Sequence, residues 1–326
     1  MRHERIFAPL RDVALDLEVV ADVAAQLGAP RFLECRHCLR DQALAFVKLG
    51  WDVFQQLREL PFPTTAMVNG FCMGGGVELA LACRYRVALD DPKVRFALPE
   101  VMLGIMPAWH GVQWLPKLVG PAAAMDMLLT GKSVDAKRAK RIGLVDQAVP
   151  LRILENTARM VTLEAKPRKS LPLMQRLMLG PLRGLVVSQA KKQVAKKARR
   201  EHYPAPYAIL ELWQKYDGDP FAAANDPSCS IESLFAHPTT ANLIRIFFLQ
   251  ERLKSLAKGV PFEARHVHVV GAGVMGGGVA QLFATRGIAV RMKDIAGAAL
   301  SNGMRHAQEL VDKQVKRRKL TKREAH

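Results

Sequence analysis

Apolar residues recur at helical spacing between residues 41 and 60 and predict a helix there. They occupy Ala43, Phe46, Val47, Val53, Phe54 and Leu57. Pro61 and Pro63 stop this helix, because proline lacks the amide donor and clashes with the preceding turn. The β-rich run from Thr64 to Val68 then predicts a strand, which ends at the turn pair Asn69-Gly70.

Short strands alternate with helices over the next eighty residues. Three glycines at positions 74–76 precede the first of these helices. The pattern predicts a helix over residues 77–83, strands at 85–89 and 94–97, helices from Gly111 onward, and a strand near 145–149. From Leu151 to about Lys258 the period is almost entirely helical.

The pattern changes at residue 266, where a strand–helix–strand unit begins. Residues 267–270 predict a strand, a glycine-rich turn and a helix to Gly287 follow, and residues 289–293 predict a second strand ending at Asp294. Two strands joined by a helix are the building unit of open α/β sheets. The chain is therefore predicted to be α/β with two different modules.

Composition and charge narrow the function classes. The 326 residues are 49% hydrophobic, which supplies enough core for two domains and excludes global disorder. The formal net charge is +18, and much of the excess positive charge lies in two runs, Lys191–Arg200 and Lys313–Arg323. These runs are interpreted as solvated helix faces, with an acidic partner such as the phosphates of coenzyme A as the alternative. Since no nucleic-acid-binding module accompanies them, no nucleic-acid partner is expected.

Targeting and metal signals are weak. No apolar run reaches 18 residues and no secretory signal opens the chain, so no transmembrane segment is predicted. Five cysteines do not form a disulfide framework, and the expected location is the cytoplasm, or mitochondria in a eukaryote. Cys35, His37 and Cys38 suggest zinc, but no second ligand pair follows at finger-like spacing, so no metal is expected.

Two glutamates occupy apolar surroundings and are candidate catalytic groups. Glu78 lies on the helix that follows the triple glycine, and Glu100 follows a predicted strand. Apolar surroundings raise a carboxyl pKa and prepare the group for proton transfer. The glycine run lets backbone N–H groups approach a developing oxyanion at the helix N-terminus. The alternative is that Glu78 is only a first-turn residue favoured by the helix dipole.

Three stretches resemble known enzymes. The first, from Pro63 to Cys83 with Gly-Gly-Gly-Val-Glu78, and the second, Leu98-Pro-Glu100-Val-Met-Leu-Gly-Ile-Met-Pro107, resemble the signature of the crotonase (enoyl-CoA hydratase/isomerase) superfamily. The stretch from Met127 to Asp146 is similar to the α-subunits of fatty-acid β-oxidation complexes, in which a hydratase is fused to a dehydrogenase. The resemblance runs from about Ala43 to the C-terminus.

The resemblance implies a crotonase-like ββα-spiral module with a helical C-terminal part and an acyl-coenzyme A thioester as substrate. It implies that Glu78 orients and deprotonates water and that Glu100 protonates the α-carbon. Gly75 would offer an oxyanion N–H, and the N–H of Ala108, where the family has glycine, would hold the water. His110 also replaces a usual glycine and is assigned no chemistry. A thiolase β-subunit is the implied protein partner.

The spacing Gly271-x-Gly273-x-x-Gly276, between a predicted strand and a predicted helix, is a dinucleotide fingerprint. Asp294 would bond the adenosine ribose hydroxyls and select NAD. Residues 269–281 resemble the opening of 3-hydroxyacyl-CoA dehydrogenases. The catalytic residues of that family lie beyond this unit, so no dehydrogenase activity is expected from this chain alone.

The resemblance is incomplete at both ends. The family's first oxyanion donor comes from a Gly-Ala-Asp-type turn, and nothing before Asp41 matches it. The expected organisation is an atypical segment at 1–40, a hydratase core at 41–155, a helical extension and linker at 156–263, and a truncated NAD-binding domain at 264–326. Two alternatives to a hydratase remain: an inactive truncated or frameshifted fragment, and a Δ3–Δ2 enoyl-CoA isomerase, against which the presence of both glutamates argues.

Overall fold

The structure is a computed structural model that describes residues 36–167, 170–256, 259, 263–316, 320, 321 and 325, with side chains from residue 43 onward. It divides into two compact units on either side of the bond between Arg252 and Leu253. The atypical segment predicted at residues 1–40 therefore lies outside the described residues, except for the helical backbone of residues 36–40.

The first unit opens with helix α2 (Arg36–Arg58), which begins five residues before the predicted start. Its strands are β1 (Thr65–Val68), β2 (Phe71–Met73), β3 (Tyr85–Leu89), β4 (Arg95–Ala97), β5 (Val134–Asp135) and β6 (Gln147–Val149). Its other helices are α3 (Gly75–Ala82), the 3₁₀ helix η2 (Pro99–Leu103), α4 (Gly111–Val119), α5 (Pro121–Thr130), α6 (Ala136–Arg141), α7 (Leu151–Glu164), α8 (Leu173–Leu179), α9 (Arg183–Ala195), α10 (Ala205–Tyr216), α11 (Ile231–Ala236) and most of α12 (Pro238–Ser255), which crosses the boundary between the units.

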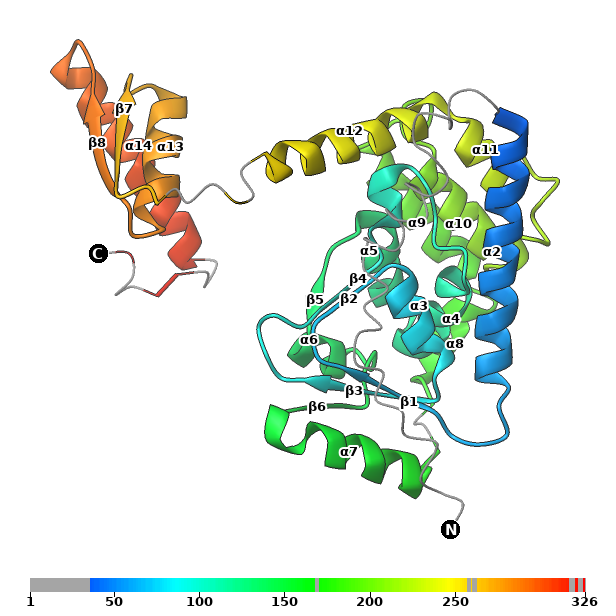
Figure 1. Ribbon diagram of the computed structural model, residues 1–326. Helices are drawn as coiled ribbons and strands as arrows, with labels where there is room; N and C mark the ends of the chain where they lie inside the picture. Colours follow the sequence, from blue (N-terminus) through cyan, green and yellow to red (C-terminus); the bar gives the residue numbers. More distant parts are fainter. Residues whose placement is uncertain are drawn as a thin grey trace. The chain divides into compact units, whose positions relative to one another are not determined.

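Two small sheets organise the first unit. Parallel strands form the first in the order β1-β3-β6, and α7 packs along it (Figure 1). In the second, β2 pairs with β4 in parallel and β4 pairs with β5 in antiparallel fashion. The predicted strands at β1, β3, β4 and β6 are confirmed. The three-residue strand β2 was not predicted, because only the turn pair Asn69-Gly70 separates it from β1.

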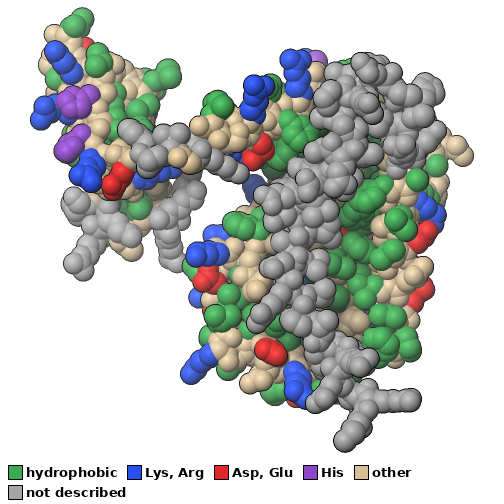
Figure 2. All heavy atoms as spheres, in the orientation of Figure 1, with side chains coloured by type: hydrophobic (Ala, Val, Ile, Leu, Met, Phe, Trp, Pro, Cys, Tyr) green, Lys and Arg blue, Asp and Glu red, His purple; other side chains and the backbone are tan. Residues whose placement is uncertain are grey.

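The core of this unit lies between the sheets and helices α3, α4, α5 and α10. Nine consecutive residues of α10, Ala205–Trp213, are buried, so this helix is surrounded on all sides by the protein. On the face of the first unit shown in Figure 2, hydrophobic side chains gather in the middle and charged ones lie mainly at the margins. Among the described helices, none is long and apolar enough to cross a lipid bilayer.

One buried cation ties the core elements together. Arg86, on β3, is only 1% exposed. Its guanidinium donates hydrogen bonds to the backbone carbonyls of Leu144 at 2.7 Å, Ala80 at 2.9 Å and Cys83 at 2.8 Å. Its Nη2 lies 3.7 Å from the Asp146 carboxylate. Arg86 therefore joins the end of α3 to the loop that leads into β6.

The second unit is a strand–helix–strand–helix unit, as the sequence predicts for its first three elements. It comprises β7 (His266–Val270), α13 (Val274–Ala284), β8 (Ala289–Lys293) and α14 (Gly297–Lys316). The two strands are parallel, in register from His266 opposite Ala289 to Val270 opposite Lys293. The two helices pack on each other, and the residues of α13 that are buried are Gly277, Ala280 and Gln281.

Candidate functional site

Parallel pairing of β2 with β4 brings the two candidate glutamates together. Met73 lies opposite Ala97, so both strands end at the same edge of the sheet. Helix α3 follows β2 and carries Glu78 in its first turn. The 3₁₀ helix η2 follows β4 and carries Glu100. The prediction that the triple glycine opens the helix of Glu78 is confirmed, while Glu100 lies in a 3₁₀ turn rather than at a strand end.

Glu78 is buried and held by backbone donors. Its side chain is 2% exposed. Its Oε1 accepts hydrogen bonds from the N–H groups of Trp109 and Gly111, each at 2.8 Å. A Cβ at Gly111 would lie 2.7 Å from this oxygen, so glycine is required for the close approach. Two donors on one oxygen favour the ionised carboxylate.

Glu100, unlike Glu78, has one buried carboxyl oxygen that no hydrogen-bond donor reaches among the described residues. Its Oε2 is inaccessible to solvent and has no hydrogen-bond partner in the part of the chain that the structure describes. Its Oε1 would lie 2.9 Å from a Cβ at Gly74, which has a φ of 54°. Gly74 therefore leaves the space that this carboxyl needs. The backbone N–H of Glu100 itself is the one donor that lowers the pKa of this carboxyl, and the buried oxygen without a donor favours the protonated form.

The electrostatics of the pair follow from these surroundings. Burial raises the pKa of Glu78, and the hydrogen bonds from Gly111 and Trp109 oppose that rise. Burial raises the pKa of Glu100 well above its usual value, and the charge of Glu78 raises it further. Two carboxyls that influence each other in this way titrate as a pair. The arrangement favours one shared proton, with the charge on Glu78.

The structure places Gly75 and Ala108, the two predicted backbone donors, close to the pair. Gly75 is the first residue of α3, and the first N–H groups of a helix lack intrahelical acceptors. The Trp109 ring covers it, because a Cβ at Gly75 would lie 2.7 Å from Cζ3 of that ring. Ala108 precedes the turn that holds Glu78, and among described residues its N–H has no acceptor.

The sequence did not reveal the donors that Trp109 and Gly111 supply to Glu78. Backbone N–H groups carry no residue-type signal, so only the three-dimensional turn identifies them. The glycine at position 111, next to the unusual His110, was the one available sign of a close approach. No group of three His, Cys, Asp or Glu residues suited to a metal occurs among the described side chains, and Cys35, His37 and Cys38 lie outside them.

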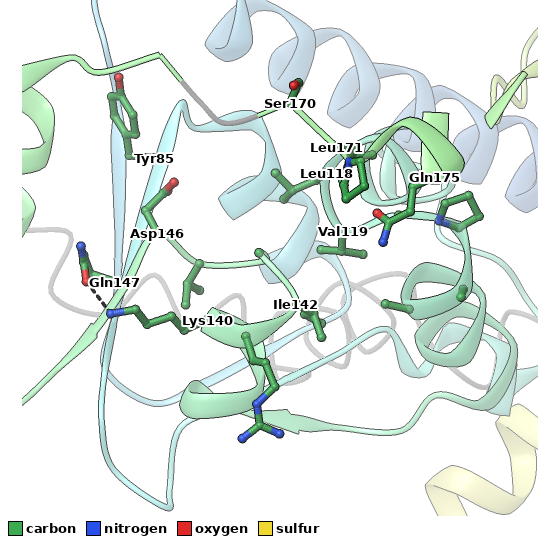
Figure 3. Close-up of a pocket in the computed structure, with 18 of the residues that line it drawn as sticks. Tyr85, Leu118, Val119, Lys140, Ile142, Asp146, Gln147, Ser170, Leu171 and Gln175 are labelled. Carbon is green, nitrogen blue, oxygen red and sulfur yellow. Dashed lines mark hydrogen bonds between the residues drawn. The ribbon is translucent and has the colours of Figure 1, made fainter. Parts of the chain in front are cut away.

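A cavity among the described residues lies away from the two glutamates. It has a volume of about 1230 Å³ and is lined by the start of α5, the loop before β6 and the segment that enters α8. Figure 3 shows Tyr85, Asp146 and Gln175 around it, and Lys140 bonded to Gln147. Neither candidate glutamate lines it.

The glycine-rich turn of the second unit has the shape that a dinucleotide site requires. Gly271 has a φ of 100°, and a Cβ at Gly276 would lie 1.9 Å from its carbonyl oxygen. Gly273 caps α13, and a Cβ there would meet nothing within 4 Å. Asp294, at the end of β8, accepts a hydrogen bond from Ala272 N–H at 2.6 Å, which lowers the pKa of its carboxyl. These residues fit a nucleotide.

Comparison with known proteins identifies the family. Residues 35–201 match the model of the enoyl-CoA hydratase/isomerase family. Residues 266–326 match that of the NAD-binding domain of 3-hydroxyacyl-CoA dehydrogenases. The chain therefore belongs to the enoyl-CoA hydratase/isomerase family and also carries a segment of a 3-hydroxyacyl-CoA dehydrogenase NAD-binding domain. The predicted family and fold class are confirmed.

The curated relatives are named as subunits of a fatty acid oxidation complex. The "Fatty acid oxidation complex subunit alpha" of Shewanella amazonensis is 39% identical over 298 residues, which are 87% of this chain and 42% of the relative. The protein of the same name from Vibrio cholerae is 38% identical over 313 residues, 90% of this chain and 42% of its own. The chain thus spans about two fifths of their length. An enoyl-CoA hydratase structure from Bacillus anthracis aligns with a TM-score of 0.37 and 27% identity, over 55% of this chain and 71% of that one.

Proposed function

We propose that the chain is an enoyl-CoA hydratase, which adds water to a trans-2-enoyl-CoA to give a 3-hydroxyacyl-CoA. The observation that carries this proposal is the pair of buried carboxyls with opposite surroundings. Glu78 accepts two N–H donors, whereas Glu100 Oε2 has no described partner. Hydration needs one base and one acid at the same place, and this pair supplies both.

The proposed roles account for every proton that the reaction moves. Glu78, ionised, takes a proton from water while the water oxygen bonds to the β-carbon of the substrate. Glu100, protonated, delivers its proton to the α-carbon. The pair ends with the proton on Glu78, and its transfer back to Glu100 restores the starting state. The raised pKa of Glu100 supports its role as the acid at neutral pH.

Backbone donors complete the proposed site. The N–H of Gly75, at the positive end of α3, would stabilise the enolate oxygen that develops on the thioester carbonyl. The N–H of Ala108 would hold the attacking water. The division into a hydratase core at 41–155, a helical extension at 156–263 and a nucleotide-binding segment at 264–326 is part of this proposal.

The test is hydration of a short trans-2-enoyl-CoA by the purified chain, followed by loss of the conjugated thioester absorbance. Glu78→Gln and Glu100→Gln should each lower kcat by roughly 10²-fold or more. Glu155→Gln is the matched control, because Glu155 is exposed on α7. Turnover that survives both site substitutions would refute the assignment.

The competing functions give different results in the same absorbance assay. An isomerase would create the conjugated absorbance from a 3-enoyl-CoA and would need only one of the two glutamates. An inactive fragment would keep the cooperative unfolding of a folded protein but hydrate nothing. The presence of both buried carboxyls, Glu78 and Glu100, favours the hydratase.

We also propose that the second unit binds NAD. Gly271, Gly273 and Gly276 would cradle the pyrophosphate at the start of α13, and Asp294 would accept the ribose hydroxyls. When bound, NAD would supply hydride-transfer chemistry. The enhancement of NADH fluorescence on titration tests this proposal, with Gly273→Ala as the variant.

Gly273→Ala separates binding from folding. The residue has a φ of −70° and open space around its Cβ position, so alanine leaves the fold intact but occupies the space that the pyrophosphate needs. Gly297→Ala is the control, because it also meets nothing within 4 Å. Equal NADH binding by the two variants would contradict the proposed cradle.

The partners and location follow from the relatives named above. We propose an acyl-CoA substrate, a thiolase β-subunit as protein partner and a cytoplasmic location. The support is that the relatives are bacterial and carry the word complex in their names. Co-purification of the chain with a thiolase subunit expressed alongside it is the direct test.

A further inference from the structure

His110 has a backbone conformation that suits glycine. It precedes α4 with a φ of 74° and a ψ of 1°, in the left-handed region. Side chains disfavour this region because the Cβ approaches the neighbouring carbonyl oxygen. A histidine that stays there must be held by its surroundings.

The conformation serves the residues on either side of His110. The N–H groups of Trp109 and Gly111 both point at Oε1 of Glu78, at 2.8 Å each. Where a backbone passes from the right-handed into the left-handed region, the N–H groups on either side can converge on one anionic atom. The left-handed turn at His110 thus makes the cradle for the Glu78 carboxylate, here called the 109–111 turn.

Aromatic stacking holds the histidine ring. It stacks between Trp51, with ring centroids 3.4 Å apart, and Trp114, with centroids 3.8 Å apart and planes 2° apart. These two residues are here called the tryptophan pair. Nε2 of His110 lies 3.0 Å from the Trp51 carbonyl, which can only accept, so Nε2 carries a proton. Nδ1 lies 2.9 Å from Oε1 of Gln113.

The ring of His110 is therefore fixed on both faces and by the hydrogen bond that Nε2 donates to the Trp51 carbonyl, and the residue is only 2% exposed. Nothing in the proposed chemistry needs the ring itself. We propose that His110 is a positioning residue, whose clamped ring locks the 109–111 turn and keeps both N–H donors aimed at Glu78. This inference rests on the proposed role of Glu78 but is testable without activity.

The first experiment measures the pKa of Glu78 directly. Carbon-13 NMR of protein labelled at the glutamate carboxyls follows its titration, with Glu78→Gln to assign the signal. In His110→Ala the strained turn relaxes, the donors turn away and the pKa of Glu78 shifts upward. In His110→Gly the turn persists, because glycine adopts positive φ freely, and the pKa stays near that of the unmodified chain.

The second experiment replaces one residue of the tryptophan pair. Trp51→Leu removes one stacking face from a half-buried position. It should raise the pKa of Glu78 when His110 is present and leave it unchanged in the His110→Gly background. Equal shifts in both backgrounds, or an unchanged pKa in folded His110→Ala, would overturn the proposal.

Kinetics distinguish this inference from the proposed function. If the chain hydrates enoyl-CoA, His110→Ala should lower kcat roughly 10- to 100-fold with little change in KM, and His110→Gly should restore most of it. If the chain hydrates nothing, the proposed function fails, while the NMR titration still decides whether His110 positions Glu78. A loss of kcat in His110→Gly equal to that in His110→Ala would refute the role of the turn.

Discussion

Replacement of Arg86 by methionine should destabilise the first unit strongly. The guanidinium donates three hydrogen bonds of 2.7–2.9 Å to backbone carbonyls, and each carbonyl would lose a charged donor. Hydrogen bonds from charged groups contribute about 1.5–3 kcal/mol each. Burial opposes this gain, as the lowered pKa of Arg86, about 10, records. We therefore expect a loss of about 3–5 kcal/mol, the usual cost of removing one partner of a buried pair.

The assay is urea unfolding followed by tryptophan fluorescence. The four tryptophans are Trp51, Trp109, Trp114 and Trp213, all in the first unit, so fluorescence reports that unit alone. A loss of this size is a large part of the about 5–15 kcal/mol that stabilises a typical domain, so the midpoint should fall steeply.

Arg95→Met is the matched control. Arg95 also lies on a strand, but its side chain is 38% exposed and its ion pair with Asp135 spans 3.9 Å. Exposed pairs contribute about 0–1 kcal/mol. If Arg86→Met cost within about 1 kcal/mol of Arg95→Met, the reasoning that the buried hydrogen bonds of Arg86 hold α3 to the sheet would be refuted.

Three further predictions concern the carboxyl pair and the glycines. Burial and the Glu78 charge raise the pKa of Glu100 in the folded chain, so the free energy of unfolding falls as pH rises from the ordinary carboxyl pKa through the raised one. Compared with the unmodified chain, Glu100→Gln should therefore resist urea better at pH 8 and equally well at pH 4. Equal resistance of the two proteins at both pH values would contradict this prediction. Gly218 has a φ of 89°, and a Cβ there would lie 2.6 Å from the backbone of α4, so Gly218→Ala should lower the free energy of unfolding by more than about 2 kcal/mol. Gly143→Ala, whose Cβ meets nothing closer than 3.8 Å, should lower it by about 1 kcal/mol. Urea unfolding measures both values. Gly303→Ala would place a Cβ 2.6 Å from the glycine-rich turn of the second unit and should therefore speed amide hydrogen exchange in α13 and α14. Gly297→Ala, whose Cβ meets nothing within 4 Å, should leave exchange unchanged. Unchanged exchange in Gly303→Ala would contradict this prediction.

Much of the site could be predicted because its residues are marked by type and spacing. The triple glycine and the apolar surroundings of Glu78 and Glu100 identify the carboxyls, and the spacing of Gly271, Gly273 and Gly276 identifies the nucleotide fingerprint. Strands β3 and β8 were predicted with their observed bounds, since their flanking turns carry proline, aspartate or glycine. These signals depend only on residues close together in the sequence, so they can be recognised without the structure.

The sequence by itself determined the family, the two modules and the candidate catalytic side chains, because residue type fixes what a group can donate, accept or titrate. Only the tertiary structure decided how the two carboxyls differ. Parallel pairing of β2 with β4 brings Glu78 and Glu100 together, and the left-handed turn at His110 gives N–H donors to Glu78 alone. The physical reason is that backbone donors look alike in every residue, so their direction depends on conformation and packing that lie far apart along the chain.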